Sequence, residues 1–267
     1  MTPFKTQLSG AHVLVTGGNK GIGRVIVESF LAEGANVSYC SRSASEDDFA
    51  TFNGAIEGAK VLGTKVDIGN QDDVRAWVEK SAEIFGRIDV VVANAFAIFH
   101  SSSIDDWRQS LEGNVIGLIT LIDTAAPHLI AREGKGSVVV LSSVAGFELR
   151  SSNPTGPQSA VKRSQAVIAK GYSKMLGQKG VRVNTVTPGI VETPSLVRAD
   201  GTEELSPFQM GKKLKPEFMQ SIIDQVPMGR PGQPQEVANA VLFLASALSG
   251  YINGVNLLLD GGFSVTL

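Results

Sequence analysis

Hydrophobic and polar positions follow two alternating patterns along this chain. Short apolar runs predict strands, and stretches with apolar residues every three or four positions predict helices between them. The predicted strands cover residues 12–16, 35–40, 60–66, 88–93, 137–141, 181–187 and 254–259. The predicted helices cover residues 22–33, 46–56, 71–85, 105–132, 158–177, 216–225 and 235–247. Because strands and helices alternate seven times, the pattern predicts the α/β class, with a doubly wound, seven-stranded parallel sheet and helices on both faces.

A single domain over residues 1–267 is expected, because no linker, repeat or low-complexity tract divides the chain. The long helix over 105–132 should bend near Pro127. Residues from about 190 to 230 are irregular apart from one predicted helix, and we interpret them as a loop segment that contacts the substrate.

Glycine and polar residues gather where the predicted strands end. These positions are Gly17 to Gly23, Ser41, Arg42, Asp67, Asn94, Ser143, Pro188 and Gly189. In a doubly wound sheet, ligands bind outside the carboxyl ends of the strands. The shared position of these residues therefore predicts one ligand site at that edge.

The first of these strand ends carries a Gly-x-x-x-Gly-x-Gly spacing, formed by Gly17, Gly21 and Gly23. Glycines let a backbone approach a ligand closely. The helix that follows directs free N–H groups and the positive end of its dipole into the turn, which suits a pyrophosphate. The turn therefore predicts a dinucleotide site, and Asn19, Lys20 and Ile22 belong to it.

Composition narrows the class of protein. With 267 residues, 43% of them hydrophobic, the chain can bury one large core. Its 24 basic and 26 acidic residues include no basic run, so neither nucleic acid nor an anionic membrane is an expected partner. The single cysteine, Cys40, fits a reducing compartment. No apolar run was expected to span a membrane, and residues 1–10 do not have the apolar core of a signal peptide, so a cytoplasmic protein is expected.

Together these motifs resemble the short-chain dehydrogenase/reductase family, over nearly the whole chain. The matching residues are Thr16, Gly17, Gly21, Ile22, Gly23, Asp67, Ile68, Asn94, Ala95, Asn114, Ser142, Ser143, Lys162, Pro188, Gly189, Asp260, Gly261 and Gly262. The resemblance implies a Rossmann-like domain that binds a nicotinamide dinucleotide. It places Asp67 and Ile68 at the adenine and Asn94 on the cofactor side of the sheet. It also places residues 188–193, including Val191 and Thr193, at the nicotinamide amide.

The same resemblance implies catalytic roles for Asn114, Ser143 and Lys162, and a homotetramer or dimer. Its long helices around Asn114 and Lys162 would pair between subunits. The small residues Ala160, Ala166, Ala169 and Gly171 on helix 158–177 permit such close approach. No metal is expected.

The end of the second strand indicates the type of cofactor. A site that reads a free ribose 2′-hydroxyl usually has an acidic residue there. This chain has Ser41 and Arg42 instead, and Lys20 lies in the glycine turn. Two cations and a hydroxyl suit a 2′-phosphate, so NADP(H) is expected. The alternative is that both cations are solvated surface charges.

One catalytic position departs from the family. The family has Tyr-x-x-x-Lys, in which the tyrosine is the acid and the lysine lowers its pKa and holds the ribose. Here the residue four before Lys162 is Gln158. An amide donates a hydrogen bond but does not release a proton near neutral pH. The site is therefore expected to polarise a substrate without protonating it, and ketone reduction should be slow.

The residues around this position suggest a small hydrophobic substrate. Phe96 replaces a family glycine and Ala93 an asparagine, while Ile98, Phe99 and Phe147 add apolar surface. Other polar residues that could reach the pocket are His100, Glu148 and Glu192. For these three, a solvated loop residue is the favoured interpretation.

Three functions remain open from the sequence. The first is an NADP(H)-dependent reductase whose substrate needs no tyrosine acid, such as a conjugated alkene or an iminium ion. The second is an enzyme of this fold with non-redox chemistry, a cyclase, dehydratase or isomerase. The third is a non-catalytic NADP(H)-binding protein. The reductase is favoured because Asn114, Ser143, Lys162 and residues 188–193 are all in place.

Overall fold

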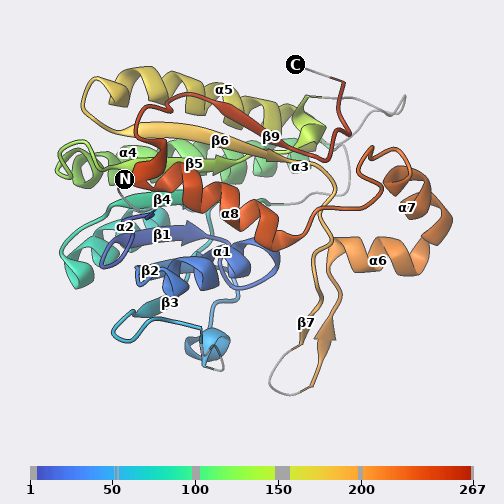
Figure 1. Ribbon diagram of the computed structural model, residues 1–267, viewed down its shortest axis with the longest axis horizontal. Coiled ribbons are helices and arrows are strands. Elements are labelled where there is room, and N and C mark those ends of the chain that lie inside the picture. Colours follow the sequence, from blue (N-terminus) through green and yellow to red (C-terminus); the bar gives the residue numbers. More distant parts are fainter. Residues whose placement is uncertain are drawn as a thin grey trace.

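A parallel sheet of seven strands forms the centre of the computed structural model, which describes residues 5–50, 52, 54–97, 103–147, 157–197 and 201–265. The strands lie in the order β3-β2-β1-β4-β5-β6-β9 (Figure 1). Their bounds are β1 His12–Thr16, β2 Asn36–Ser41, β3 Val61–Lys65, β4 Val90–Ala93, β5 Ser137–Leu141, β6 Arg182–Pro188 and β9 Asn256–Leu259. The order reverses between β1 and β4, so the predicted doubly wound sheet is confirmed.

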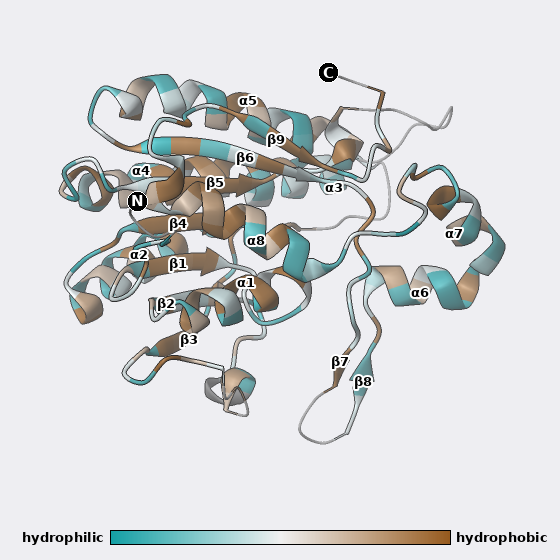
Figure 2. Ribbon diagram, in the orientation of Figure 1, coloured by the Kyte–Doolittle hydropathy of each residue, from teal (hydrophilic) through white to brown (hydrophobic). Residues whose placement is uncertain are grey.

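Helices cover both faces of this sheet. On one face α1 (Gly21–Ala32) packs against α8 (Pro234–Ala245), and on the other lie α2 (Gln71–Phe85), α4 (Gly117–Ile130) and α5 (Gln158–Gly177). The central strands β1, β4 and β5 are buried along their whole length, and most of their residues are hydrophobic (Figure 2). Alternate strand residues enter opposite cores: Val139 faces α8, whereas Val138 and Val140 face α4 and α5.

The amino edge of the sheet, away from the predicted site, is held by a buried charge cluster. The carboxylate of Asp89 accepts two hydrogen bonds from Arg87, at 2.6 and 2.7 Å, and one from Arg132, at 2.8 Å. It also accepts the backbone N–H of His12 at 2.8 Å. These bonds tie together segments next to β1, β4 and β5, so we assign this cluster to stability.

The prediction of a helix over residues 46–56 is wrong. Among the described residues of this stretch, which exclude 51 and 53, only a 3₁₀ helix forms, Glu46–Phe49. The hydroxyl of Tyr39 donates to Asp48 and to the carbonyl of Ser45, each at 2.8 Å, which fixes a single turn against β2. The chain then returns to α1, where the amide of Ile56 donates to the carbonyl of Leu31.

The long helix predicted over 105–132 is interrupted, but not at Pro127. It divides into α3 (Ile104–Leu111), a π-helical turn (Glu112–Ile116) and α4, with Pro127 inside α4. Such turns insert one extra residue into a helix and often mark functional sites. By length and composition alone, the run Ile104–Ile130 is long and apolar enough to cross a membrane. Half of the most apolar 18-residue stretch of this run is buried inside the protein, as in the core helix of a globular protein.

The segment about 190–230 contains more structure than expected. Two helices form, α6 (Pro207–Leu214) and α7 (Pro216–Ile223), together with an antiparallel pair of two-residue strands, β7 (Leu196–Val197) and β8 (Glu203–Glu204). All four lie on the side of the molecule to which the sheet strands point (Figure 1). The prolines begin these helices rather than break them, because proline fits the first helical position.

One residue proposed for subunit pairing is placed differently. Ala169 is buried in the domain's own core, whereas Ala160 and Gly171 are exposed on α5. Ala169 therefore packs against this chain's own sheet. The homotetramer stays a prediction.

Candidate active site

The glycine turn after β1 is packed tightly against the end of β4. Gly17 has a φ of +68°, in the region that favours glycine. A Cβ on Gly23 would lie 2.0 Å from the carbonyl oxygen of Gly17, so only glycine lets α1 begin this close to the strand. The side-chain amide of Asn94 donates to the carbonyls of Thr16 and Gly17, at 2.9 and 3.1 Å. Asn94 therefore holds the turn, as the resemblance implied for the cofactor side of the sheet.

The first turn of α1 is available to an anion. Lys20, the N-cap residue, makes no capping bond with its side chain, and the described first turn contains no acidic residue. The amides of Gly21, Ile22 and Gly23 therefore point out of the helix end with the positive end of its dipole. This geometry can hold a pyrophosphate.

A cleft of about 210 Å³ lies beside this turn, at the ends of β1, β2, β3 and β4. It brings together most of the predicted adenosine-side residues. Its lining includes Gly17, Asn19, Lys20, Ser41, Arg42, Asp67, Ile68, Asn94 and Phe96. Two cations thus face one cleft, together with the hydroxyl of Ser41. Lys20 is also paired within the protein, because its Nζ lies 2.5 Å from Oε1 of Glu204 on β8.

Lys162 lies buried at the carboxyl end of β5. Its Nζ donates to the carbonyl of Leu141 at 2.7 Å and lies 4.4 Å from the centre of the Phe96 ring. Its own carbonyl accepts the hydroxyl of Ser142 at 2.8 Å, which fixes α5 against the strand end. Burial lowers the pKa of Lys162 to about 7, because the ammonium has lost its hydration. The lysine therefore changes charge near neutral pH.

Gln158 is the first residue of α5 and is exposed, one turn before Lys162. None of the chain's three tyrosines, all of them described, replaces it. The Tyr39 hydroxyl bonds Asp48, the Tyr172 hydroxyl donates to Asp123 at 2.5 Å, and Tyr251 is fully exposed beside the 3₁₀ helix Ala247–Ser249. The position that carries the family's acid has no phenol.

Ser143 follows β5 and begins a short 3₁₀ helix, Val144–Gly146. Its hydroxyl oxygen accepts the amide of Ala145 at 3.2 Å, so the hydroxyl hydrogen can be directed elsewhere. Ser143 and Lys162 thus reach the end of the same strand from the loop and from α5.

Asn114 lies in the π-helical turn and is buried. Its side chain accepts from the amide of Ala97 at 2.8 Å and donates to the carbonyl of Ala97 at 3.0 Å, which fixes the segment after β4. Its backbone carbonyl accepts Nε2 of Gln165 at 2.9 Å. Asn114 acts here as a positioning residue.

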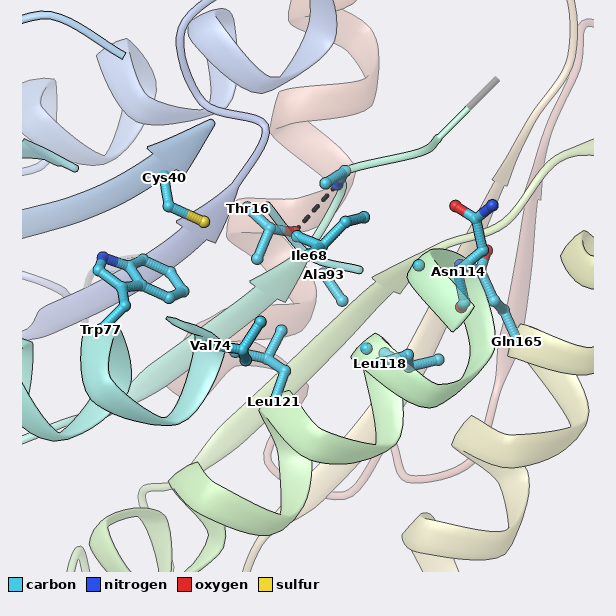
Figure 3. A pocket seen from close by; sticks show the side chains of 13 residues that line it. Thr16, Cys40, Ile68, Val74, Trp77, Ala93, Asn114, Leu118, Leu121 and Gln165 are labelled. Carbon is cyan, nitrogen blue, oxygen red and sulfur yellow. Dashed lines mark hydrogen bonds between the residues drawn. The ribbon is translucent and has the colours of Figure 1, made fainter. Parts of the chain in front are cut away.

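Gln165 was not predicted from the sequence. It lies three residues after Lys162, hence on the same face of α5. It lines a small cavity of about 20 Å³ beneath the cleft (Figure 3), with Trp77 and Cys40 at the far end. Among the described residues, Oε1 of Gln165 and Nε1 of Trp77 are buried without a hydrogen-bond partner. A cavity of this size fits one water molecule and no substrate.

The predicted nicotinamide-amide segment crosses the same edge of the sheet. The amide of Gly189 donates to Leu259 on β9, and Val191 forms a bridge with Gly232. Thr193 lies near the glycine turn: its Cγ2 is 3.9 Å from where a Cβ on Gly21 would stand. The segment therefore continues the site from β6 towards the glycine turn.

Several residues considered from the sequence do not enter this description. Ile98, Phe99, His100 and Glu148 lie outside the described residues. Glu192 pairs with Lys212 at 3.1 Å, as a surface residue would. The guanidinium of Arg163 lies over the ring of Phe147, with its Cζ 4.5 Å from the ring centre.

Comparison with known proteins gives concordant results. The model of a family described as enoyl-(acyl carrier protein) reductase matches residues 17–264. An isoepoxydon dehydrogenase of Penicillium expansum is 38% identical, with 97% of each chain covered. A 2,5-dichloro-2,5-cyclohexadiene-1,4-diol dehydrogenase of Sphingobium indicum is 34% identical, over 97% of this chain and 99% of its own. The solved structure of a short-chain dehydrogenase/reductase from Brucella melitensis has a TM-score of 0.82 and 28% identity, over 98% of this chain and 100% of its own.

The burial of Lys162 predicts how stability depends on pH. Between pH 7 and the ordinary lysine pKa of about 10.4, the unfolded chain binds a proton that the folded chain has released. The free energy of unfolding should therefore rise with pH in that window, by up to about 1.4 kcal/mol per pH unit relative to Lys162→Met. Urea unfolding at pH 7.5, 8.5 and 9.5 measures the difference. Lys170→Met, which removes an exposed lysine from the same helix, is the control. If the difference in unfolding free energy between the parent and Lys162→Met does not change with pH, Lys162 is not buried in a partly neutral form.

Proposed function

Because this chain belongs to the short-chain dehydrogenase/reductase family and is an oxidoreductase, we propose that it is an NADP(H)-dependent reductase whose substrate needs no proton from a tyrosine. A conjugated alkene is the substrate class that the site fits best, and an iminium ion is the second. The observation that carries this proposal is Gln158 at the head of α5, one turn from the buried Lys162.

The residues present fit a bound NADP(H). The amides at the head of α1 would hold the pyrophosphate, and Asp67 and Ile68 would border the adenine. Arg42, Lys20 and Ser41 share the cleft where a 2′-phosphate would lie. Lys162, at the end of β5, would hold the ribose. The nicotinamide amide would meet Pro188, Gly189, Val191 and Thr193. When bound, the reduced nicotinamide supplies a hydride.

The chain's own side chains can stabilise a developing negative charge. Ser143 and the Lys162 ammonium are the donors at the end of β5. In a conjugated carbonyl compound, hydride addition at carbon sends negative charge to the oxygen, and these donors can stabilise it there. The α-carbon then takes its proton from water in a later step. A ketone is less suited, because its oxygen needs a proton as the hydride arrives.

The description of the matching family supports this substrate class. The matching family is described as an enoyl reductase, and an enoyl group is a conjugated alkene. The Sphingobium relative is named a dehydrogenase of an unsaturated ring diol, so its named substrate carries alkene bonds beside the alcohols. Relatives named as dehydrogenases favour hydride transfer over the non-redox and non-catalytic alternatives. Phe96, whose ring centre lies 4.4 Å from Nζ of Lys162, supports an apolar substrate.

The cofactor assignment predicts a strong effect of charge reversal at Arg42. Arg42→Asp should weaken NADPH binding by about 2 kcal/mol or more, because a charge-assisted bond becomes a repulsion. NADH binding should change much less. Fluorescence titration of both cofactors measures this, with Arg75→Asp on the exposed surface of α2 as the matched charge reversal. If the unmodified protein binds NADH and NADPH equally well, the residues at the end of β2 do not bind a 2′-phosphate.

The missing phenol predicts a gain of function. Gln158→Tyr places a phenol one turn from Lys162, whose ammonium can lower the phenol's pKa. Ketone reduction should then rise by about 10²–10⁴-fold, the usual contribution of a general acid. Steady-state rates on one ketone compare the parent, Gln158→Tyr and Gln158→Phe, the last having the ring without the hydroxyl. If the parent already matches Gln158→Tyr, another group supplies the proton, and His100 and Glu148 should be replaced next. If Gln158→Phe gains as much, packing explains the effect.

A further inference from the structure

An ion pair joins the glycine turn to a distant part of the chain. Nζ of Lys20 lies 2.5 Å from Oε1 of Glu204, and the two side chains are 51% and 37% exposed. Glu204 belongs to β8, 184 positions along the chain. The carboxylate thus stands at the border of the cleft that Lys20 lines with Arg42.

The protein's own backbone holds Glu204 in this place. Glu204 is paired with Leu196 in the antiparallel β7–β8 ladder. Two residues further on, the hydroxyl of Ser206 donates to the carbonyl of Thr193 at 2.7 Å. Thr193 in turn lies beside the glycine turn. The ion pair therefore closes a short loop of contacts between the turn and the β7–β8 hairpin.

We propose that Glu204 is a specificity-determining residue, because its carboxylate competes with the cofactor's 2′-phosphate for Lys20. This inference rests on the proposed use of NADP(H). In the free protein the ammonium is neutralised by Glu204, and a 2′-phosphate takes it over on binding. Glu204 therefore reduces the affinity for a 2′-phosphorylated cofactor and leaves the affinity for a 2′-hydroxyl cofactor unchanged.

The charges decide which anion Lys20 binds. A phosphate monoester has between one and two negative charges near pH 7, and the carboxylate has one. The phosphate would also meet Arg42, whose fork can bind two of its oxygens. An exposed ion pair contributes little free energy, so the carboxylate is readily displaced. For the same reason its removal should have a modest effect, about threefold in affinity.

Displacement also has a consequence for the segment over the substrate. When Lys20 moves to the phosphate, the β7–β8 hairpin loses this ion pair with the turn, while the bond from Ser206 to Thr193 keeps its base in place. Binding at the adenosine end is thereby linked to the segment that carries α6 and α7. This linkage is reciprocal, so loosening the hairpin should favour the phosphorylated ligand.

Calorimetric titration with adenosine 2′,5′-bisphosphate and with AMP tests the proposal without the nicotinamide. Glu204→Gln should bind the bisphosphate about threefold more tightly than the parent and AMP equally well. Glu203→Gln is the matched control, because Glu203 is the adjacent, exposed residue of the same strand with the same charge. In a Lys20→Met background, Glu204→Gln should no longer change bisphosphate binding.

The outcomes separate this inference from the proposed function. If the parent prefers the bisphosphate and Glu204→Gln has no effect, or Glu203→Gln has the same effect, the competition is wrong and the NADP(H) assignment stands. If neither the parent nor Glu204→Gln prefers the bisphosphate, both fail. If the preference exists only in Glu204→Gln, competition for Lys20 is supported and the parent is not an NADP(H) protein.

Discussion

The burial of the Lys162 ammonium is the constraint on which this active site depends. A charge removed from water is costly unless the protein supplies partners. Here a carbonyl at the end of β5 and the ring of Phe96 are partners that compensate only in part, because burial still lowers the pKa of Lys162 to about 7. Both are supplied by the carboxyl edge of the sheet, so α5 must begin close to the ends of β4 and β5. The bond from Ser142 to the lysine carbonyl fixes that position. Gln158, one turn earlier, is thereby placed at the same edge.

The same edge explains why a large part of the site could be predicted from the sequence. Residues that end parallel strands meet in space whatever their separation along the chain, so Gly17, Arg42, Asp67 and Asn94 converge on one cleft. The apolar runs that predicted the strands are buried on both faces, which leaves them no other arrangement. Most of the fold follows from these two facts.

What the sequence did not predict depends on contacts between distant residues. The short turn at residues 46–49 is set by Tyr39, and no local pattern contains that bond. The π-helical turn at Asn114 leaves the apolar spacing almost unchanged. The bond from Gln165 to the Asn114 carbonyl and the pairing of Lys20 with Glu204 join separate elements, so neither has a sequence motif. In contrast, α6 had a readable signal in Ser206 followed by Pro207, a cap and a first helical residue.

A site with donors but no phenol should separate hydride transfer from proton transfer in time. The direct measurement is the reduction of a conjugated enone in single turnovers, with NADPH carrying deuterium at the transferred position, in H₂O and in D₂O. We expect that the labelled cofactor slows the chemical step, that D₂O does not, and that solvent deuterium appears at the α-carbon. If D₂O slows that step together with the label, a proton moves with the hydride, and a protein acid that this account excludes is at work.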